Sequence, residues 1–222
     1  MERHIDQELK ELNKEILRMG AYTEEAIFKS VEALKNRDRD LAKSVVDNDR
    51  NIDTLELNID EKCVDLIARY QPMAKDLRLI TTGMKLNTEL ERISDIAVDI
   101  AQRVLEIVDK PILKPLVDIP KLTAIAQHMV KTAVDSFING DVELAKKVII
   151  SDSEADKLRD SITKELVDSY MSKDASTAPR AVQLLLIARF LERICDHATN
   201  IAEDVIYMVE AEVVKHHPEK LK

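Results

Sequence analysis

The sequence predicts an all-α protein built from two tandem three-helix bundles, which together form an elongated six-helix molecule. Three observations support this fold class. Apolar residues recur at alternating steps of three and four over long stretches, as in helices that pack side by side. Glycine occurs only three times and aromatic residues make up 3% of the chain, which disfavours a β-rich fold. The second half of the chain also repeats the pattern of the first.

The first bundle is predicted to span residues 1–110 and to contain three helices of roughly 30 residues each. Short breaks at Asn36-Arg37-Asp38 and at Gln71-Pro72 separate them, so neighbouring helices should be antiparallel. The first apolar stripe contains Ile5, Leu9, Leu12, Ile16, Met19, Thr23, Ala26 and Ser30. The second contains Leu41, Val45, Asn48, Ile52, Leu55 and Ile59, and the third contains Leu86, Leu90, Ile93, Ala97, Ile100, Val104 and Ile107.

A proline-containing linker is predicted at residues 111–120, because Pro111, Pro115 and Pro120 should interrupt any helix there. A second three-helix bundle is predicted at residues 121–215, followed by a polar tail at 216–222. The third stripe recurs 101 residues later as Ile187, Leu191, Ile194, Ala198, Ile201, Val205 and Met208. Upstream of it the offset between matching residues is 103, so that Asn36 corresponds to Asn139. These constant offsets indicate an internal duplication.

The duplication produces four pairs of acidic residues spaced four apart, which places both carboxylates of a pair on one helix face. The pairs are Asp49/Asp53, Glu91/Asp95, Asp152/Asp156 and Glu192/Asp196. Asp49 and Asp95 are equally far from Pro72 in sequence, as are Asp53 and Glu91. The second-half pairs are arranged in the same way about Asp174. Each antiparallel helix pair should therefore bring two acidic pairs to the same height.

These positions lie outside the apolar stripes, so we expect an open surface groove in each half. Clustered carboxylates suit hard cations such as magnesium, calcium, manganese or iron. The predicted metal ligands are Asp49, Asp53, Glu91, Asp95, Asp99, Asp152, Asp156, Glu192, Asp196 and Asn200. The alternative is a solvated charged face that is paired locally with Arg50, Arg92 or Arg193. For His197, a hydrogen-bonding role is favoured over metal ligation.

Composition excludes several other functions. The formal net charge of −9 disfavours direct binding of nucleic acid, which requires clustered Lys and Arg. No stretch is long and apolar enough to span a bilayer, so any membrane association should be peripheral and should occur through partners. The two cysteines, Cys63 and Cys195, lie far apart in the sequence and lack the spacing of a redox or zinc site. We therefore expect a cytoplasmic protein with reduced thiols.

The chain resembles the PhoU family of phosphate-uptake regulators along nearly its whole length. The resemblance rests on Gln71–Arg78, on Leu90-Glu91-Arg92-Ile93-Ser94-Asp95, and on the run from Leu191 to Ala202. It implies two tandem three-helix bundles with metal motifs at the four acidic pairs, where the metal could be iron, zinc, manganese, magnesium or calcium. Ser94 and Asp99 depart from the glycine and asparagine common in the family, so the two sites should differ in affinity.

The resemblance also implies a homodimer without catalytic activity. Such a protein would repress phosphate uptake and phosphate-starvation signalling through two partners, the ATPase subunit of the phosphate ABC transporter and a sensor histidine kinase. The residues leave two alternatives open. One is a carboxylate-based metalloenzyme and the other is a purely structural helical scaffold.

Overall fold

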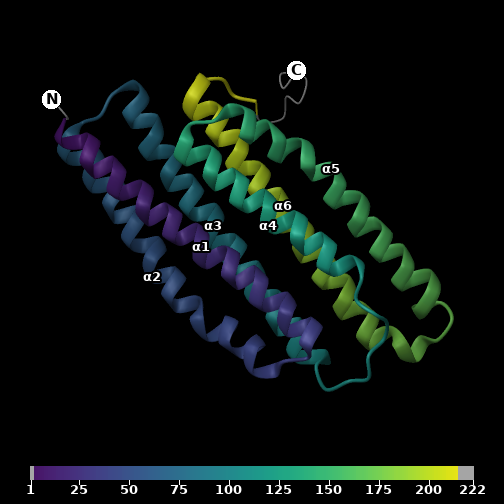
Figure 1. Ribbon diagram of the computed structural model, residues 1–222. Coiled ribbons are helices and arrows are strands. Elements are labelled where there is room, and N and C mark those ends of the chain that lie inside the picture. The colour runs from purple at the N-terminus through teal and green to yellow at the C-terminus, as the bar shows by residue number, and fades with distance from the viewer. Residues whose placement is uncertain (1–2, 215–222) are drawn as a thin grey trace.

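The computed structural model describes residues 3–214 and shows six long helices in this part of the chain (Figure 1). The first half contains α1 (His4–Asn36), α2 (Arg39–Tyr70) and α3 (Ala74–Ile107). The second half contains α4 (Asp118–Asn139), α5 (Val142–Glu165) and α6 (Ala178–Glu210). A π-helical turn at Leu166–Met171 and a 3₁₀ turn at Ala175–Thr177 connect α5 to α6. The predicted tail at 216–222, together with residue 215, lies outside the described residues.

The predicted stripes form the core. Every residue of the first, third and repeated third stripes is buried, including the polar Thr23 and Ser30. Their hydroxyls donate to the backbone carbonyls of Met19 and Ile27, which satisfies them inside the core. In the second stripe, Asn48 is exposed instead and lines a groove between α1 and α2. An amide at this position costs less in water than in an apolar interior.

The second helix of each repeat begins with the same kind of N-cap. Asp38 caps α2 by accepting a hydrogen bond from the backbone of Leu41, and Asp141 caps α5 through Leu144. These turns and the break at 71–73 agree with the predicted positions. The segment between α3 and α4 is as long as the predicted linker but lies three residues earlier, at 108–117, because α3 ends at Ile107 and α4 begins at Asp118 and includes Pro120. Proline is tolerated in the first turn of a helix, where the backbone N–H groups have no intrahelical acceptor.

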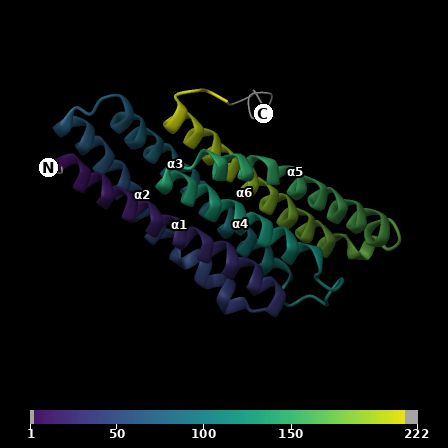
Figure 2. The same cartoon turned by 45° about the horizontal axis from the view of Figure 1, so that its top comes forward.

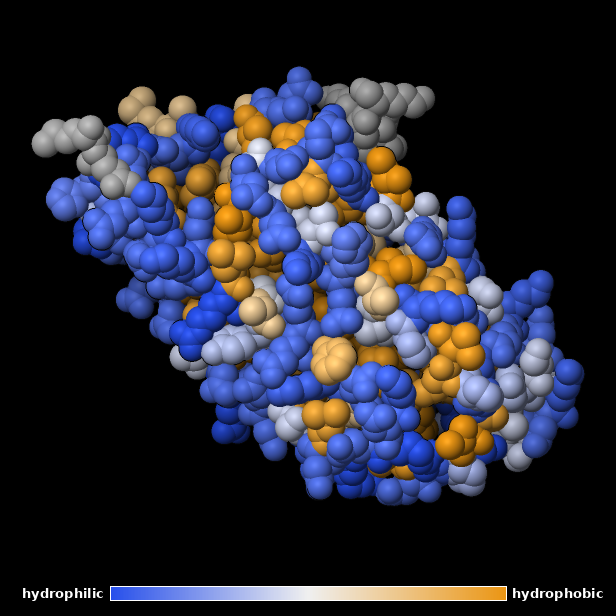
Figure 3. Space-filling model, viewed as in Figure 1, coloured by the Kyte–Doolittle hydropathy of each residue, from blue (hydrophilic) through white to orange (hydrophobic). Residues whose placement is uncertain are grey.

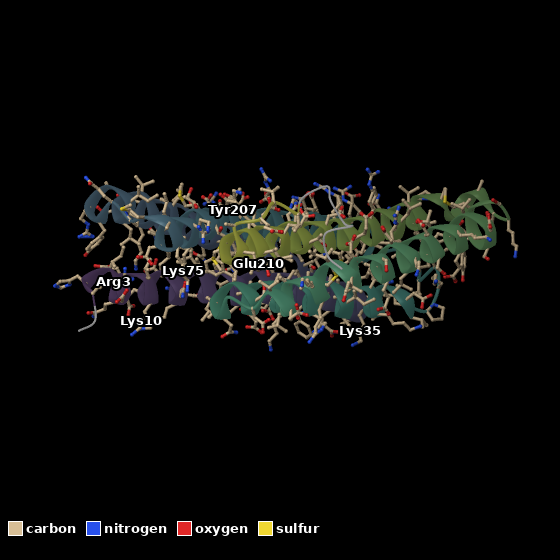
Figure 4. The ribbon with its side chains drawn as sticks, turned by 90° about the horizontal axis from the view of Figure 1, so that it is seen from above. Arg3, Lys10, Lys35, Lys75, Tyr207 and Glu210 are labelled. Atoms are coloured by element: carbon tan, nitrogen blue, oxygen red, sulfur yellow. The ribbon has the colours of Figure 1, made fainter. Side chains whose placement is uncertain are left out.

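The helices are arranged in two layers, which are visible from above (Figure 4). One layer holds α1 and α4, and the other holds α2, α3, α6 and α5, with α3 and α6 at its centre. The apolar residues buried in both halves form one continuous cluster. On the face formed by α1 and α4, hydrophobic side chains are interspersed among a larger number of hydrophilic ones (Figure 3). None of the helices in residues 3–214 is long and apolar enough to cross a membrane.

The central helices α3 and α6 run antiparallel, because their contacts advance along α3 as they retreat along α6. Arg78 donates to the carbonyl of Met208, Lys85 pairs with Asp204 at 2.8 Å, and Glu89 meets His197. This order places the equivalent residues Ile93 and Ile194, both fully buried, near the point where the two repeats are related by a pseudo-twofold axis. The acidic pairs on α3 and α6 flank this point.

Candidate functional site

The structure brings the acidic residues of the first half together on neighbouring helices. Asp49 and Asp53 lie on α2, and Glu91, Asp95 and Asp99 lie on α3. The charge of Asp95 raises the pKa of Asp49, and the charge of Asp53 raises the pKa of Glu91, so the two acidic pairs lie close together across the helices, in agreement with their equal distances from Pro72. All five are exposed or half-buried. The prediction of a surface location is therefore confirmed for this group.

Partial burial and mutual repulsion both disfavour the ionised forms in this group. Burial raises the pKa of Asp49, and the charges of Asp53 and Asp95 raise it further. The pKa of Asp95 is raised by burial and by its neighbours Asp53 and Asp99. The Oδ1 atom of Asp49 is buried without a hydrogen-bond partner. This oxygen has therefore lost contact with water and has no donor in exchange.

The acidic residues of the second half are gathered in the same way on α5 and α6. Burial, together with the charges of Asp196 and Asp156, raises the pKa of Asp152 to about 6. The pKa values of Glu192 and Asp196 are also raised, in each case mainly by burial. Asp152 is thus the acidic residue of this half whose charge is most strongly disfavoured at neutral pH.

A basic residue distinguishes the second group from the first. Arg159 of α5 lies 3.0 Å from Asp156, 3.3 Å from Glu192 and 3.3 Å from Asp160. Its guanidinium bridges α5 and α6 and partly neutralises the carboxylates there. The equivalent residue of the first repeat is Glu56, whose negative charge raises the pKa of Glu91. We name the acidic surface formed by Asp49, Asp53, Glu56, Glu91, Asp95 and Asp99 the first cluster, and the surface formed by Asp152, Asp156, Arg159, Glu192 and Asp196 the second cluster.

Glu56 and Arg159 are absent from the residues predicted from the sequence. The offset of 103 residues that relates Asp53 to Asp156 also relates Glu56 to Arg159. Both lie three residues beyond the second acid of their pair, on nearly the same helix face. A search of the duplicated segment for charge reversals would have identified them.

Asn200 lies in a different environment from its equivalent, Asp99. Its amide donates to Oε2 of Glu89 on α3 at 3.2 Å, across the boundary between the two repeats. His197 meets the same oxygen at 2.6 Å. The favoured hydrogen-bonding role of His197 is thereby confirmed. Arg92 contacts the other oxygen of Glu89 at 3.1 Å, so a half-buried polar network joins α3 to α6.

Glu89 is held in its ionised form by this network. Burial alone would raise its pKa, but the hydrogen bonds from His197 and Asn200 outweigh burial and leave the pKa below its usual value. The equivalents of Glu89 and His197 in the opposite repeats are Phe190 and Ile96, which are apolar. The duplication therefore did not preserve this network.

In neither cluster do the carboxylates converge on a common point. Across residues 3–214, no three His, Cys, Asp or Glu side chains lie in a geometry that could hold a metal ion. The chemistry of the donors still suits a hard cation, particularly in the first cluster, which contains only carboxylates. Cation binding would require some of these half-exposed side chains to change rotamer.

Comparison with known proteins identifies the same internal duplication that the fold and the two clusters show. The model of the PhoU domain matches residues 16–104 and again residues 119–205. The chain belongs to the PhoU family. The two PhoU domains correspond to the two three-helix repeats, from within α1 to α3 and from α4 to α6. The predicted family and fold class are thereby confirmed.

Individual relatives extend the PhoU similarity over almost the whole chain. The phosphate-specific transport system accessory protein PhoU homolog of Aquifex aeolicus is 42% identical over 209 residues, which cover 94% of each protein. The crystal structure of PhoU from Pseudomonas aeruginosa superposes with a TM-score of 0.89 at 37% identity, covering 94% of this chain and 100% of that one. The phosphate transport system regulatory protein PhoU of Streptococcus pneumoniae superposes with a TM-score of 0.87 at 25% identity, covering 94% and 98%. These names describe accessory and regulatory proteins, which supports the prediction that the chain is not an enzyme.

Proposed function

We propose that the chain is a negative regulator of phosphate uptake and of phosphate-starvation two-component signalling. The single observation that carries this proposal is the match of both repeats to the PhoU domain. The relatives in Aquifex aeolicus and Streptococcus pneumoniae are named for accessory and regulatory roles in phosphate transport. The names of these relatives support the regulatory role in phosphate transport. The role in two-component signalling goes beyond these names and is part of the proposal.

In this proposal the protein acts in the cytoplasm as a homodimeric adaptor. It connects the ATPase subunit of the phosphate ABC transporter with the sensor histidine kinase, and it meets the membrane only through these partners. The two layers of long helices support an adaptor role, because they offer extended faces on both sides of the molecule (Figure 2).

The proposal includes a divalent or trivalent cation at the first cluster. There Asp49, Glu91 and Asp95 all have raised pKa values, and the unpartnered Oδ1 of Asp49 is a free acceptor. A bound cation would supply the positive charge that Arg159 supplies in the second cluster. The cation would therefore neutralise the first cluster and stabilise the α2–α3 pair.

Deletion of the gene in the source cell tests the regulatory role. With abundant phosphate, the deletion strain should express a phosphate-starvation reporter, and the intact gene supplied in trans should silence it again. Co-purification of the tagged chain with the transporter ATPase, and separately with the sensor kinase, tests the adaptor role. A reporter that stays silent in the deletion strain would contradict the proposal.

Elemental analysis of protein purified without chelator tests the cation, together with melting temperatures measured in EDTA and in added manganese, magnesium, calcium, zinc or iron. Bound metal and a higher melting temperature are expected. The variant Glu91→Gln should lose most of the shift, and Glu154→Gln, at an exposed position on α5, should retain it. A protein that holds no metal and does not respond to any of these ions would be a helical scaffold with a solvated acidic face.

A further inference from the structure

A cavity lies beneath the linker that joins the two repeats. The linker itself is the teal segment at the lower right in Figures 1 and 2. It has a volume of about 220 Å³ and is bounded by the ends of α1 and α3, by the linker and by the start of α6. Its apolar lining includes Leu34, Val104, Ile107, Leu113, Leu116 and Leu184. Both repeats thus contribute to one cavity, at the place where the chain passes from one repeat to the other.

Four basic residues and no acidic ones are among the described residues that line this cavity. They are Lys35, Arg37, Lys114 and Arg180. Such an accumulation is unusual in a chain with a formal net charge of −9. Lys35 pairs with Glu32, and Lys114 with Glu165. The cavity is therefore electropositive in an acidic protein.

The hydrogen-bond partners of the two arginines are uncharged, unlike the glutamates that pair with the lysines, although the charge of Arg180 also helps to lower the pKa of Asp174. Arg37 donates to the backbone carbonyls of Val108 and Lys110, and Arg180 donates to the carbonyl of Pro111 at 3.2 Å. A carbonyl oxygen accepts a hydrogen bond but carries no full charge, so it does not neutralise a guanidinium. Each guanidinium also has five N–H donors, more than these bonds use. Arg37 and Arg180 can therefore bind an anion while they hold the linker.

Arg37 occupies a backbone conformation that favours glycine. Its φ and ψ are 57° and 42°, in the left-handed region, at the end of α1. The equivalent residue of the second repeat is Gly140, with φ of 62° and ψ of 36°. A residue with a side chain is strained in this conformation because its Cβ crowds the backbone. Lys35 is likewise replaced by Ile138 in the second repeat. The first repeat therefore has a strained basic residue at a position where the second repeat has an uncharged glycine.

We propose that this cavity binds a small organic anion with an apolar body, such as an alkyl carboxylate or an alkyl phosphate monoester. The anionic head lies between Arg37 and Arg180, and the apolar body lies against the leucine walls. Inorganic phosphate has no apolar part and binds much less tightly. Because the cavity is built from both repeats and the linker, the ligand stabilises their junction.

The test is calorimetric titration of the full chain with hexyl phosphate, hexanoate, hexanol and inorganic phosphate. At least one of the two anionic amphiphiles should bind, and about tenfold or more tightly than hexanol and inorganic phosphate, because each of these lacks one of the two interactions. Which of the two binds more tightly identifies the head group. Equal binding of hexanol, or of inorganic phosphate, would overturn the proposal, as would the failure of both amphiphiles to bind.

Two pairs of matched variants locate the binding. Ile112 at the cavity and Ile150 on α5 are both 69% exposed, so a glutamate should cost the fold little at either position. Ile112→Glu should weaken binding of the preferred amphiphile by about tenfold through charge repulsion, and Ile150→Glu should leave it unchanged. Arg180→Gln should weaken it similarly, and Arg189→Gln, at an exposed position on the same helix, should not. Equal effects within either pair would show that the anion binds elsewhere.

Discussion

Glu56 and Arg159 occupy equivalent positions in the two repeats and carry opposite charges. In the second cluster, Arg159 bridges Asp156 and Glu192. In the first cluster, Glu56 adds a negative charge near Glu91. One cluster thus contains its own counter-charge, and the other requires one from outside. Asp99 alone predicts unequal sites, and the opposite charges of Glu56 and Arg159 make the two clusters differ further.

Reversing the charge at position 159 should make the second cluster depend on cations. Arg159→Glu removes the contacts to Asp156 and Glu192 and adds a fifth carboxylate. In EDTA we expect a loss of about 2 kcal/mol, or roughly 4–8 °C in melting temperature for a chain of this size. Added manganese or magnesium should restore more of this loss than it adds to the wild type. Lys157→Glu, the same charge reversal at an exposed neighbouring position, is the control and should change the melting temperature little.

The stability contributed by Asp152 should decrease as the pH rises. Its pKa is about 6 in the folded protein, compared with a usual value of 3.8. The folded state therefore holds more protons than the unfolded state between these values, and ionisation destabilises the fold fully only above pH 6. Asp152→Asn should raise the free energy of unfolding at pH 7.5 by about 1 kcal/mol, after allowance for solvent screening, and by nothing near pH 3. Urea denaturation at the two pH values measures this, and an equal gain at both would contradict it.

Glu89 should be one of the most sensitive polar residues at the boundary between the repeats. Glu89→Gln removes a charge that receives hydrogen bonds from His197 and Asn200 and an ion pair from Arg92. The expected loss is about 1–3 kcal/mol in the free energy of unfolding. Glu25→Gln on α1, where the glutamate is more exposed, should cost less than about 0.5 kcal/mol. A double-mutant cycle with His197→Gln should show a coupling of at least 0.5 kcal/mol, and purely additive losses would rule out the network.

Close packing between α1 and α4 depends on Gly20. A Cβ atom at this position would lie 3.3 Å from Cγ2 of Val134 on α4. Gly20→Leu should therefore separate the helices and cost about 1–3 kcal/mol, despite the better helix propensity of leucine. Val134→Ala in the same chain should recover part of the loss, although it destabilises the wild type. Chemical denaturation of the four proteins measures this, and a Gly20→Leu variant as stable as the wild type would show that α4 can move away freely.

Much of the fold could be predicted because local patterns specify it. The stripe from Leu86 to Ile107 is buried throughout, as is its repeat from Ile187 to Met208, because a helix with one apolar side has one way to bury it. The breaks after Asn36 and Tyr70 were predictable from the turn residues. The start of α4 was not, because a proline such as Pro120 interrupts a helix interior but is accepted in a first turn.

The candidate site was predictable only in part. The equal height of Asp49 and Asp95 follows from the position of the turn between α2 and α3, so sequence distance was sufficient. The direction of Asn200 was not predictable, because it depends on how α6 packs against Glu89 of the other repeat. Long-range packing of this kind leaves no periodic pattern in the sequence.

By itself, the sequence determined the six helices, the duplication and the four acidic pairs, because each is a regularity within or between helical segments. Only the tertiary structure decided what surrounds each charge. The sequence offset pairs Glu56 with Arg159 and Arg37 with Gly140, but only the structure shows that Arg159 bridges Asp156 and Glu192 and that Arg37 donates to carbonyls of the linker. The energy of a charge depends on its neighbours in space, and the docking of the two repeats and their linker determines which residues those are.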